Sequence, residues 1–290
     1  MPRHAYRIVN VFADAASPQH PLTGNPLCVF ENGAAIDDKT QQALAQQFNL
    51  SESVFILPSN KATARIRIYT TAYEMPFAGH PTLGAAHVVR ALRGESGAVD
   101  ALTLETLAGV IPVNARGDEW TLKANAPVAR PLAMDDAAFA ELMGLNIGDL
   151  ARPPVWVSTG NEQLIAPLAS VEAVRRCRPD AARMAKLKEP ADAGKILAWA
   201  NLPNGEILAR FFLLNHGTLR EDFGTGSAAA NLCGWFVTQQ NPPLPLPLQR
   251  VMWQGEPIGR PAKLMLNVDA QGDIRIGGRV VELGAGSVSL

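Results

Sequence analysis

The spacing of hydrophobic and polar positions predicts short strands and few helices in the first half of the chain. Residues 64–70 alternate polar and apolar side chains, which is the period of a strand with one buried face. Residues 37–49 carry apolar positions at helical spacing, between an aspartate suited to begin a helix and an asparagine suited to end one. Residues 84–92 are small and apolar, as in a buried helix. Further strands are expected at 5–12, 27–30 and 53–58.

The same order of elements recurs in the second half of the chain. Residues 209–214 predict a strand, and the Gly-rich turn Gly224-Thr225-Gly226-Ser227 opens a helix that continues to Val237. Three matches between the halves share one offset, since 210 − 67 = 225 − 82 = 228 − 85 = 143. They are Arg67 with Arg210, Thr82 with Thr225, and Ala85-Ala86 with Ala228-Ala229. A shorter echo links Thr23-Gly24-Asn25 to Thr159-Gly160-Asn161. An internal duplication is the simplest cause.

We therefore expect an α+β protein with two pseudo-symmetric domains, each a strongly curved, mostly antiparallel sheet around one central helix. A length of 290 residues suits two domains, and the short connections between strands favour antiparallel pairing. The first domain is expected to cover residues 1–117 and to be completed by the last strand, residues 275–290. The second is expected to cover residues 118–265.

Composition narrows the class of partner. Lys and Arg together number 26, and Asp and Glu number 27, so the formal net charge is −1 and nothing favours nucleic acid or an anionic membrane. The N-terminal segment lacks the apolar run of a signal peptide, and no stretch of about 18 apolar residues occurs. We expect a cytoplasmic protein that acts on a small molecule.

Cysteine and histidine positions argue against two other kinds of site. The three cysteines, Cys28, Cys177 and Cys233, show no CxxC spacing. An odd number cannot all pair within the chain, which suits a reducing compartment. The five histidines show no HxH or HExxH spacing, so we expect no metal site.

The two duplicated helix starts are candidate anion sites. A helix start offers backbone N–H groups and a partial positive charge, and glycine lets a ligand approach the backbone. A carboxylate or phosphate is the expected ligand, although glycines also serve tight turns alone. Residues 224–229 fit the loose dinucleotide pattern GxGxxA as well. That pattern requires a strand that runs straight into the turn, and here a polar loop, residues 215–221, intervenes, so we do not expect a nucleotide cofactor.

Three residues near these turns could carry acid/base chemistry. Glu52 stands between a helix end and an apolar strand, where partial burial would raise the pKa of its carboxyl toward the working pH. His80 and Asp222 lie at the two helix starts, so a cleft between the halves would bring both near Glu52. The other interpretations are a solvated loop glutamate, a turn histidine and a helix-capping aspartate.

Five motifs resemble, in order, those of the phenazine-biosynthesis PhzF-like family, and together they span nearly the whole chain. They are Gly24-Asn25-Pro26, Asn49-Leu50-Ser51-Glu52, Glu74-Met75-Pro76-Phe77-Ala78-Gly79-His80-Pro81-Thr82-Leu83-Gly84, Glu221-Asp222-Phe223-Gly224-Thr225-Gly226-Ser227-Ala228 and Gln254-Gly255-Glu256-Pro257-Ile258-Gly259-Arg260-Pro261. Five motifs in family order are far more specific than any one of them, so the chain is identified as a member of this family.

The resemblance implies a fold of the diaminopimelate-epimerase type, with a β-barrel around a central helix in each domain. It also implies an active site between the domains, no cofactor and commonly a homodimer. The best-known member isomerises trans-2,3-dihydro-3-hydroxyanthranilate with the glutamate that matches Glu52, and His80 and Asp222 become further catalytic residues. By the same match, the substrate-binding residues are Asn25, Gly79, Pro81, Thr82, Gly224, Thr225, Gly226 and Ser227.

We thus expect a cofactor-independent isomerase that moves a proton on a small anionic, carboxylate-bearing substrate. Phe223-Gly224 replaces the Pro-Ala that is usual in the family, at the border of the expected pocket, so the substrate itself stays undefined. Two alternatives remain open: an amino-acid epimerase or racemase, and a small-molecule-binding protein with the same fold and no catalysis. Cysteine-using epimerases place thiols at both acid/base positions, and Cys28 and Cys233 fall outside the matching motifs.

Overall fold

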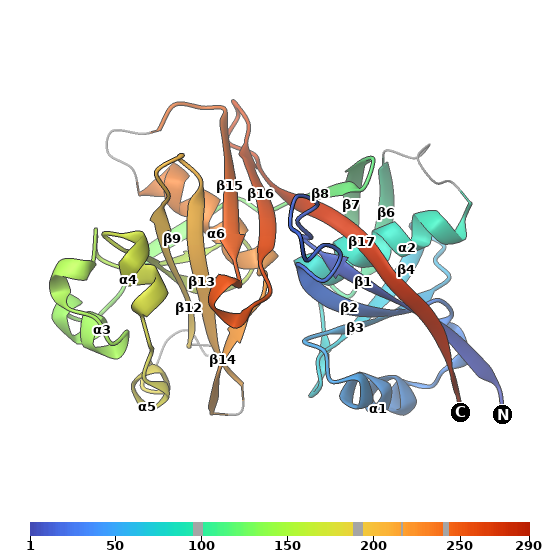
Figure 1. The fold of residues 1–290 in the computed structure, drawn as a ribbon. Helices are drawn as coiled ribbons and strands as arrows, with labels where there is room; N and C mark the ends of the chain where they lie inside the picture. Colours follow the sequence, from blue (N-terminus) through green and yellow to red (C-terminus); the bar gives the residue numbers. More distant parts are fainter. Residues whose placement is uncertain (95–100, 188–193, 216, 240–243) are drawn as a thin grey trace. The chain divides into compact units, whose positions relative to one another are not determined.

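The computed structural model describes residues 1–94, 101–187, 194–215, 217–239 and 244–290 (Figure 1). These residues form two compact units. Unit 1 contains Met1–Lys123 and Gly277–Leu290, and unit 2 contains Ala124–Ile276. The expected division at residue 117 falls between two paired strands of unit 1, and unit 2 continues beyond the expected residue 265.

Unit 1 is a closed barrel. Its strands are β1 (Arg3–Val11), β2 (Asn25–Phe30), β3 (Ser53–Leu57), β4 (Ala64–Tyr69), β5 (Glu74–Met75), β6 (Ala101–Thr106), β7 (Gly109–Arg116), β8 (Glu119–Lys123) and most of β17 (Ile274–Ser289). Antiparallel pairs join β17 to β1, β1 to β2, β3 to β4, and β6 through β7 to β8. Parallel pairs join β2 to β3 and β4 to β6. The pairing of β17 with β8 closes the ring.

The helix α2 (Gly79–Leu92) forms the core of this barrel. It contacts β1, β2, β3, β4, β6 and β8, and most of its side chains are buried. At Gly84 an added Cβ would lie 2.6 Å from Leu27 and 3.0 Å from Val11. The small residues of the segment, which predict a buried helix, therefore allow the helix to approach the strands closely. The observed helix begins five residues earlier than the predicted segment, at Gly79.

Unit 2 repeats this arrangement. Its strands are β9 (Val128–Pro131), β10 (Val155–Ser158), β11 (Glu162–Pro167), β12 (Lys195–Asn201), β13 (Ile207–Asn215), β14 (Thr218–Asp222), β15 (Leu248–Gln254) and β16 (Ala262–Val268). Its helices are α3 (Asp136–Leu142), α4 (Val171–Arg176), α5 (Ala181–Met184) and the buried α6 (Gly226–Thr238). Short 3-10 helices lie at Gly33–Ala35 in unit 1 and at Ile147–Asp149 and Glu256–Ile258 in unit 2.

The order of strand pairs is the same in both units. In unit 1, β1 to β2 is antiparallel, β2 to β3 parallel, β3 to β4 antiparallel and β4 to β6 parallel. In unit 2 the same alternation runs from β10 through β11, β12 and β13 to β15. α2 and α6 each precede the strand that makes the second parallel pair. The predicted α+β fold of two pseudo-symmetric, mostly antiparallel units is confirmed.

The two copies keep a common register only as far as the hairpin before the central helix. Phe55 pairs with Arg67 and Ala198 with Arg210, at the predicted offset (198 − 55 = 210 − 67 = 143). The helices follow a longer offset (226 − 79 = 147). The cause is the hairpin, because paired residues are nine apart at Phe212 and Glu221 but five apart at Tyr69 and Glu74.

The predicted matches beyond that hairpin are therefore wrong. Thr225 is the N-cap of α6, and its equivalent at α2 is Ala78, not Thr82. In the same way Ala228-Ala229 do not match Ala85-Ala86, which lie further along α2. Ser227, the second residue of α6, is the equivalent of His80, the second residue of α2.

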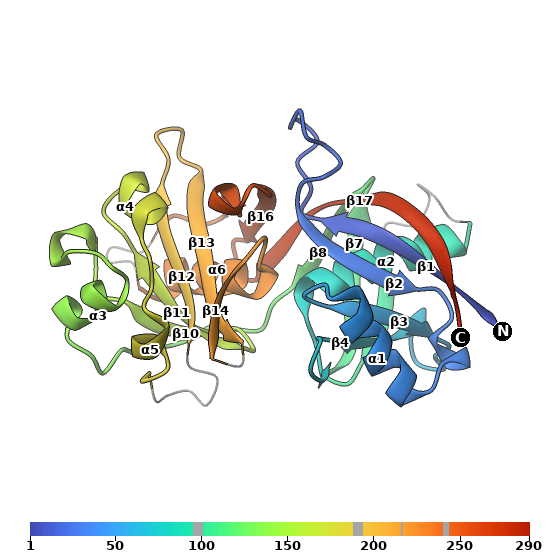
Figure 2. The same cartoon turned by 60° about the horizontal axis from the view of Figure 1, so that its bottom comes forward.

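Helix α1 (Asp38–Phe48) covers the outer side of β2 and β3 (Figure 2). Asp37 begins it as predicted, since its side chain accepts a hydrogen bond from Thr40 N at 3.1 Å. Phe30 and Phe55 stack beneath the helix with ring centroids 4.7 Å apart. This apolar layer directs the face of β3 that carries Phe55 toward α1.

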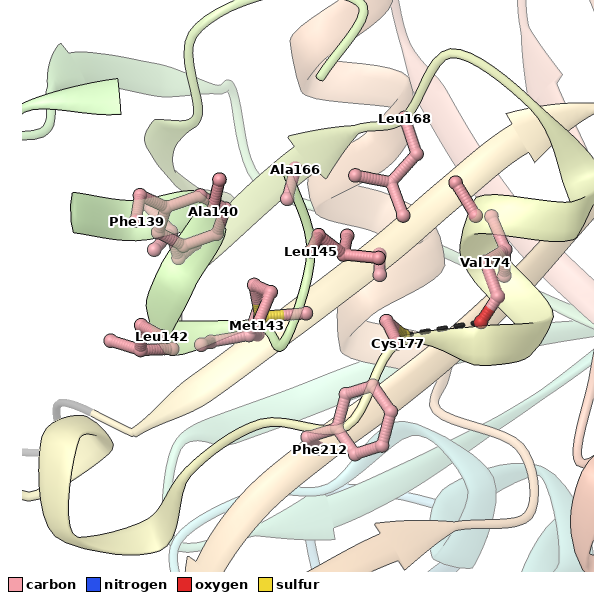
Figure 3. Close-up of a cluster of buried hydrophobic side chains, with 14 of the residues drawn as sticks. Phe139, Ala140, Leu142, Met143, Leu145, Ala166, Leu168, Val174, Cys177 and Phe212 are labelled. Carbon is pink, nitrogen blue, oxygen red and sulfur yellow. Dashed lines mark hydrogen bonds between the residues drawn. The ribbon is translucent and has the colours of Figure 1, made fainter. Parts of the chain in front are cut away.

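A larger apolar layer lies between α3, α4 and the sheet of unit 2 (Figure 3). Phe139 from α3, Val174 from α4 and Phe212 from β13 all belong to it. Cys177 closes α4 inside this layer, and its thiol donates to Val174 O at 3.1 Å (Figure 3). The thiol is thus part of the packing of unit 2.

Candidate active site

Glu52 lies in the short link between α1 and β3. Asn49 ends α1 with a φ of 53°, a left-handed conformation that asparagine tolerates better than most residues. β3 then begins at Ser53. Regular structure on both sides therefore fixes the backbone of Glu52.

The pleat of β3 directs Glu52 toward α2. Phe55 faces α1, and successive side chains on a strand point to opposite faces. Glu52 therefore shares the other face with Val54, which is fully buried. That face packs against α2.

The structure brings His80 together with Glu52. His80 is the second residue of α2, and its side chain is 7% exposed. Its Nε2 lies 3.6 Å from Oε2 of Glu52, whose side chain is 17% exposed. That distance is slightly long for a hydrogen bond.

Burial changes the acidity of Glu52. It raises the pKa of this carboxyl to about 6, and a hydrogen bond from Ser51 opposes the rise. Oε2 is among the buried side-chain atoms. A carboxyl with such a pKa is mostly ionised at neutral pH and can still hold a proton transiently. The interpretation of Glu52 as a solvated loop residue does not fit this environment.

Asn25 is held beside the same link. It is fully buried at the start of β2, and its Oδ1 lies 3.4 Å from Ser51 Oγ. The preceding Gly24 has a φ of +80°, and a Cβ there would lie 2.4 Å from Val11 O. Only glycine fits both conditions. The Gly-Asn-Pro motif therefore fixes Asn25 next to the residue that precedes Glu52.

The other predicted substrate-binding residues of unit 1 differ in what they can offer. Gly79 is the first residue of α2, where N–H groups have no partner within the helix, and Ala78 provides no side-chain cap. Pro81 is buried and has no N–H. Thr82 is fully buried, and its hydroxyl donates to Ala78 O at 2.7 Å. The backbone at the helix start is better suited to a ligand than the side chains of Pro81 and Thr82.

In unit 2, Asp222 organises the turn before α6. One carboxylate oxygen accepts from Phe223 N at 2.9 Å, and the other accepts from the Thr225 hydroxyl at 2.5 Å. Gln254 accepts from Thr225 N at 3.1 Å and donates to Asp222 O at 2.9 Å. Asp222 therefore holds the turn rather than capping the helix, since the N-cap of α6 is Thr225 and both bonds to Asp222 come from residues before the first helical residue. The Thr225 amide, one of the predicted ligand contacts, already donates its hydrogen bond to the Gln254 side chain.

The start of α6 still offers backbone donors. Gly224 is buried in the turn and Gly226 is the first helical residue. Thr225, at the N-cap, makes no side-chain cap to the amides that follow. Ser227 comes next, and its Oγ accepts a hydrogen bond from Gln163 Nε2 at 2.9 Å.

Two glutamines of this region were not predicted from the sequence. Gln254 is the first residue of the fifth family motif, so a signal for it was present. Gly255 follows it with a φ of +79°, and a Cβ there would lie 2.7 Å from Phe223 O. Gln163 lies in an apolar strand and carries no local signal. Its contact with Ser227 depends on the fold of the whole unit.

A metal site and a membrane-spanning helix are both absent from the described part of the chain. It contains no group of three or more His, Cys, Asp or Glu side chains that could hold a metal ion. No helix within it is long and apolar enough to cross a membrane. The three cysteines are free and fully buried, and burial raises the pKa of each thiol, to about 11 for Cys177.

Comparison with known proteins shows which proteins the whole chain is similar to. An uncharacterized isomerase of Pasteurella multocida is 33% identical over 288 residues, covering 98% of this chain and 94% of its own length. The trans-2,3-dihydro-3-hydroxyanthranilate isomerase of Pseudomonas aeruginosa is 30% identical over 276 residues, covering 93% and 92%. The crystal structure of a PhzF-family phenazine biosynthesis protein of Bacillus anthracis matches the fold with a TM-score of 0.86 over 100% of both chains, at 24% identity.

The fold and these relatives define the chain as an isomerase with two similar units, each built around a central helix. The family model described as phenazine biosynthesis-like protein matches residues 9–286. The chain belongs to this family, as its five motifs predict.

Proposed function

We propose that the protein moves a proton between carbon atoms of a small carboxylate-bearing substrate, with Glu52 as the acid/base and without a cofactor. The observation that carries this proposal is the position of the Glu52 carboxyl. It is largely buried, has a pKa of about 6, and lies 3.6 Å from His80 at the start of α2. A group that both takes and returns a proton needs a pKa near the working pH.

In the proposed reaction the ionised Glu52 takes a proton from a substrate carbon. The C–H bond breaks, an O–H bond forms on Glu52, and the electron pair enters the conjugated system of the substrate. The neutral acid then returns the proton to another carbon, where a new C–H bond forms. No oxidant or reductant is needed. Burial of Glu52 helps the first transfer, because it lowers the cost of the protonated state relative to the ionised one.

His80 and the helix starts would stabilise the charge on the substrate. The imidazole of His80 is buried beside Glu52 and can donate to an oxygen on which negative charge develops. The amides at Gly79, Gly226 and Ser227 lie at positive helix ends, which favour a carboxylate. We assign Asp222 to holding the turn before α6, because both its carboxylate oxygens accept hydrogen bonds within that turn.

The first compound to test is trans-2,3-dihydro-3-hydroxyanthranilate, the substrate in the name of the Pseudomonas aeruginosa relative. It carries the carboxylate that the helix starts would bind. The experiment measures deuterium incorporation at substrate carbon from heavy water. We expect exchange with the wild type and a loss of about 10²- to 10⁴-fold in Glu52→Gln.

A matched variant controls for the loss of a carboxylate in general. Glu172 lies exposed on α4, so Glu172→Gln should exchange like the wild type. Equal exchange rates in Glu52→Gln and Glu172→Gln would overturn the role of Glu52. Binding of the compound without any exchange in the wild type would instead favour the binding-protein alternative.

The epimerase alternative has less support. A two-thiol mechanism needs accessible thiolates, whereas Cys28 and Cys233 are fully buried and burial raises the pKa of both thiols. A carboxylate pair would need a second acid/base beside the substrate carbon, and we assign Asp222 instead to the turn before α6, where each of its oxygens accepts a hydrogen bond. Loss of optical activity in an amino acid during turnover would revive this alternative.

We also propose that the protein is a cytoplasmic homodimer. The support is the family resemblance, and the three free cysteines suit a reducing compartment. Light scattering of the purified protein would measure its molar mass. A mass equal to one chain of 31.0 kDa would rule out the dimer.

A further inference from the structure

A continuous chain of hydrogen bonds runs beneath the start of α6. Thr159 N donates to Asn231 Oδ1 at 2.8 Å, and Asn231 Nδ2 donates to Asn161 O at 2.8 Å and to Gln163 Oε1 at 2.9 Å. Gln163 Nε2 in turn donates to Ser227 Oγ at 2.9 Å. Asn231 is 0% exposed and Gln163 is 1% exposed.

The direction of every bond in this chain is fixed by chemistry. A backbone N–H can only donate, so the Asn231 atom facing Thr159 must be its oxygen. A backbone carbonyl can only accept, so the Asn231 atom facing Asn161 must be its nitrogen. That nitrogen also faces Gln163, which must present its own oxygen to it.

The last step concerns Ser227. Since the oxygen of Gln163 faces Asn231, its nitrogen faces Ser227 and donates to the hydroxyl. The Ser227 hydroxyl proton cannot point back at that N–H group. No hydrogen bond donated by this hydroxyl is found among the described residues. By contrast, the neighbouring Thr225 hydroxyl donates to Asp222.

We propose that Gln163 is a positioning residue that, oriented by Asn231, holds the Ser227 hydroxyl as a donor toward a carboxylate oxygen of the substrate. This inference rests on the proposed function. The advantage is energetic. A hydroxyl that must rotate before it can donate loses free energy of binding to that reorientation, whereas a hydroxyl that is already oriented does not. The buried amides also exclude the opposite polarity at this contact, in which Ser227 would donate its proton to Gln163 and have no proton left for the substrate.

The polarity can be tested without any ligand. Neutron diffraction from deuterated crystals locates the hydrogen atoms. We expect deuterium on Gln163 Nε2 pointing at Ser227 Oγ, and the Ser227 deuterium pointing away from Gln163. A Ser227 deuterium that points at Gln163 would overturn the inference, whatever the enzyme turns over.

A single substitution at Asn231 should reverse the direction of the hydrogen bond between Gln163 and Ser227. In Asn231→Asp the side chain can no longer donate to Gln163, so the Gln163 amide must turn its nitrogen toward the introduced carboxylate. Its oxygen then takes the Ser227 proton. With trans-2,3-dihydro-3-hydroxyanthranilate as the probe, we expect KM to rise on the order of 10- to 100-fold, as for a lost hydrogen bond to a charged group, and kcat to change less.

The double variant separates positioning from a merely structural effect. Ser227→Ala should raise KM similarly, and Asn231→Asp should add nothing in the Ser227→Ala background. Additive effects would contradict the inference. Gln41→Glu is the matched control, since Gln41 is a buried amide of unit 1, 1% exposed, that donates to Gly33 O and Ile36 O. It should lower stability and leave KM unchanged.

A second variant covers failure of Asn231→Asp to fold. Gln163→Met keeps the length of the side chain and removes its polarity, so the Ser227 hydroxyl is free to rotate, and KM should rise several-fold. An unchanged KM in Gln163→Met would count against the inference. Failure of the proposed function is a different result, because it would appear as deuterium exchange that persists in Glu52→Gln.

Discussion

Arg67 and Arg210 occupy equivalent places in the two units, and each forms a two-point ion pair with a glutamate across the hairpin that precedes the central helix. Arg67 donates through Nε and a terminal nitrogen to Glu74, at 2.8 and 2.6 Å. Arg210 donates in the same way to Glu221, at 3.0 and 2.7 Å. Five residues after each glutamate the central helix begins. Within each unit the pair therefore fixes the hairpin, and with it the point at which the central helix begins.

The first prediction concerns the stability cost of Glu52. Its folded pKa, about 6, is raised from the ordinary value of 4.5, so the folded state binds more protons than the unfolded state between these values. The contribution of Glu52 to stability is therefore most favourable below pH 4.5 and is lost as the pH rises through about 6. Glu52→Gln lacks this loss and should be more stable than the wild type at about pH 8, by about 2 kcal/mol. Urea unfolding at pH 4.5 and about pH 8 measures the difference, which should largely disappear at the lower pH.

The second prediction is the acidic limb of activity. In the proposed reaction Glu52 must be ionised to take a proton, and its pKa is about 6. We expect kcat/KM to fall about tenfold per pH unit below that value. A pH profile of deuterium exchange checks this, with Glu172→Gln following the wild type. A rate that stays level from about pH 8 down to pH 4.5 would show that another group takes the proton.

The third prediction concerns the ion pair in unit 2. Arg210 and Glu221 are only 5% and 10% exposed, and Arg210 also donates to the carbonyls of Val174 and Cys177 at the end of α4. Removing one partner leaves a buried charge alone, so Arg210→Met should lower the free energy of unfolding by about 3 to 5 kcal/mol.

The control for Arg210→Met is an exposed pair of the same unit. Arg183 and Glu141 are 44% and 65% exposed. Arg183→Met should cost no more than about 1 kcal/mol. Equal losses in the two variants, measured by urea unfolding, would mean that burial does not decide the strength of these pairs.

The fourth prediction concerns the glycine before Asn25. Gly24 has a φ of +80°, and a Cβ would lie 2.4 Å from Val11 O. Gly272 has a φ of +88° and nothing within 4 Å of an added Cβ. Both alanine variants carry the same backbone strain, of order 1 kcal/mol or more, and only Gly24→Ala adds a collision with main chain. Thermal unfolding should therefore show a clearly larger loss in Gly24→Ala, and deuterium exchange should fall because Asn25 and the Glu52 link move.

Much of the fold could be predicted from local signals. The alternation at residues 64–70 predicted β4, and Asp37 and Asn49 predicted both ends of α1, because strand period and helix caps depend on neighbouring residues alone. The repeat of Arg67 and Arg210 identified the duplication. It failed beyond the hairpin, because the extra residues between Phe212 and Glu221 shift everything after them and no local pattern records an insertion.

The site was predictable where a motif carried it. The family motifs named Glu52 and His80, which the structure brings to 3.6 Å of each other. They could not show that the Thr82 hydroxyl donates to Ala78 O in its own first turn or that Gln254 accepts from the Thr225 amide. Nor could they show that Gln163 donates to the Ser227 hydroxyl. Each of these contacts joins residues on different elements or depends on a rotamer, and spacing along the chain does not determine them.

The strand β17 has a consequence for the synthesis of the protein. It follows all of unit 2 in the sequence, yet it pairs with both β1 and β8 and closes the barrel of unit 1. As the chain emerges from a ribosome, residues 124–276 can complete their unit before β17 has been made. Until then residues 1–123 lack the closing strand of their barrel, and the edges of β1 and β8 are unpaired. The part of the enzyme that carries Glu52 is therefore made first and finished last, and until then its open edges are the ones most exposed to mispairing with other chains.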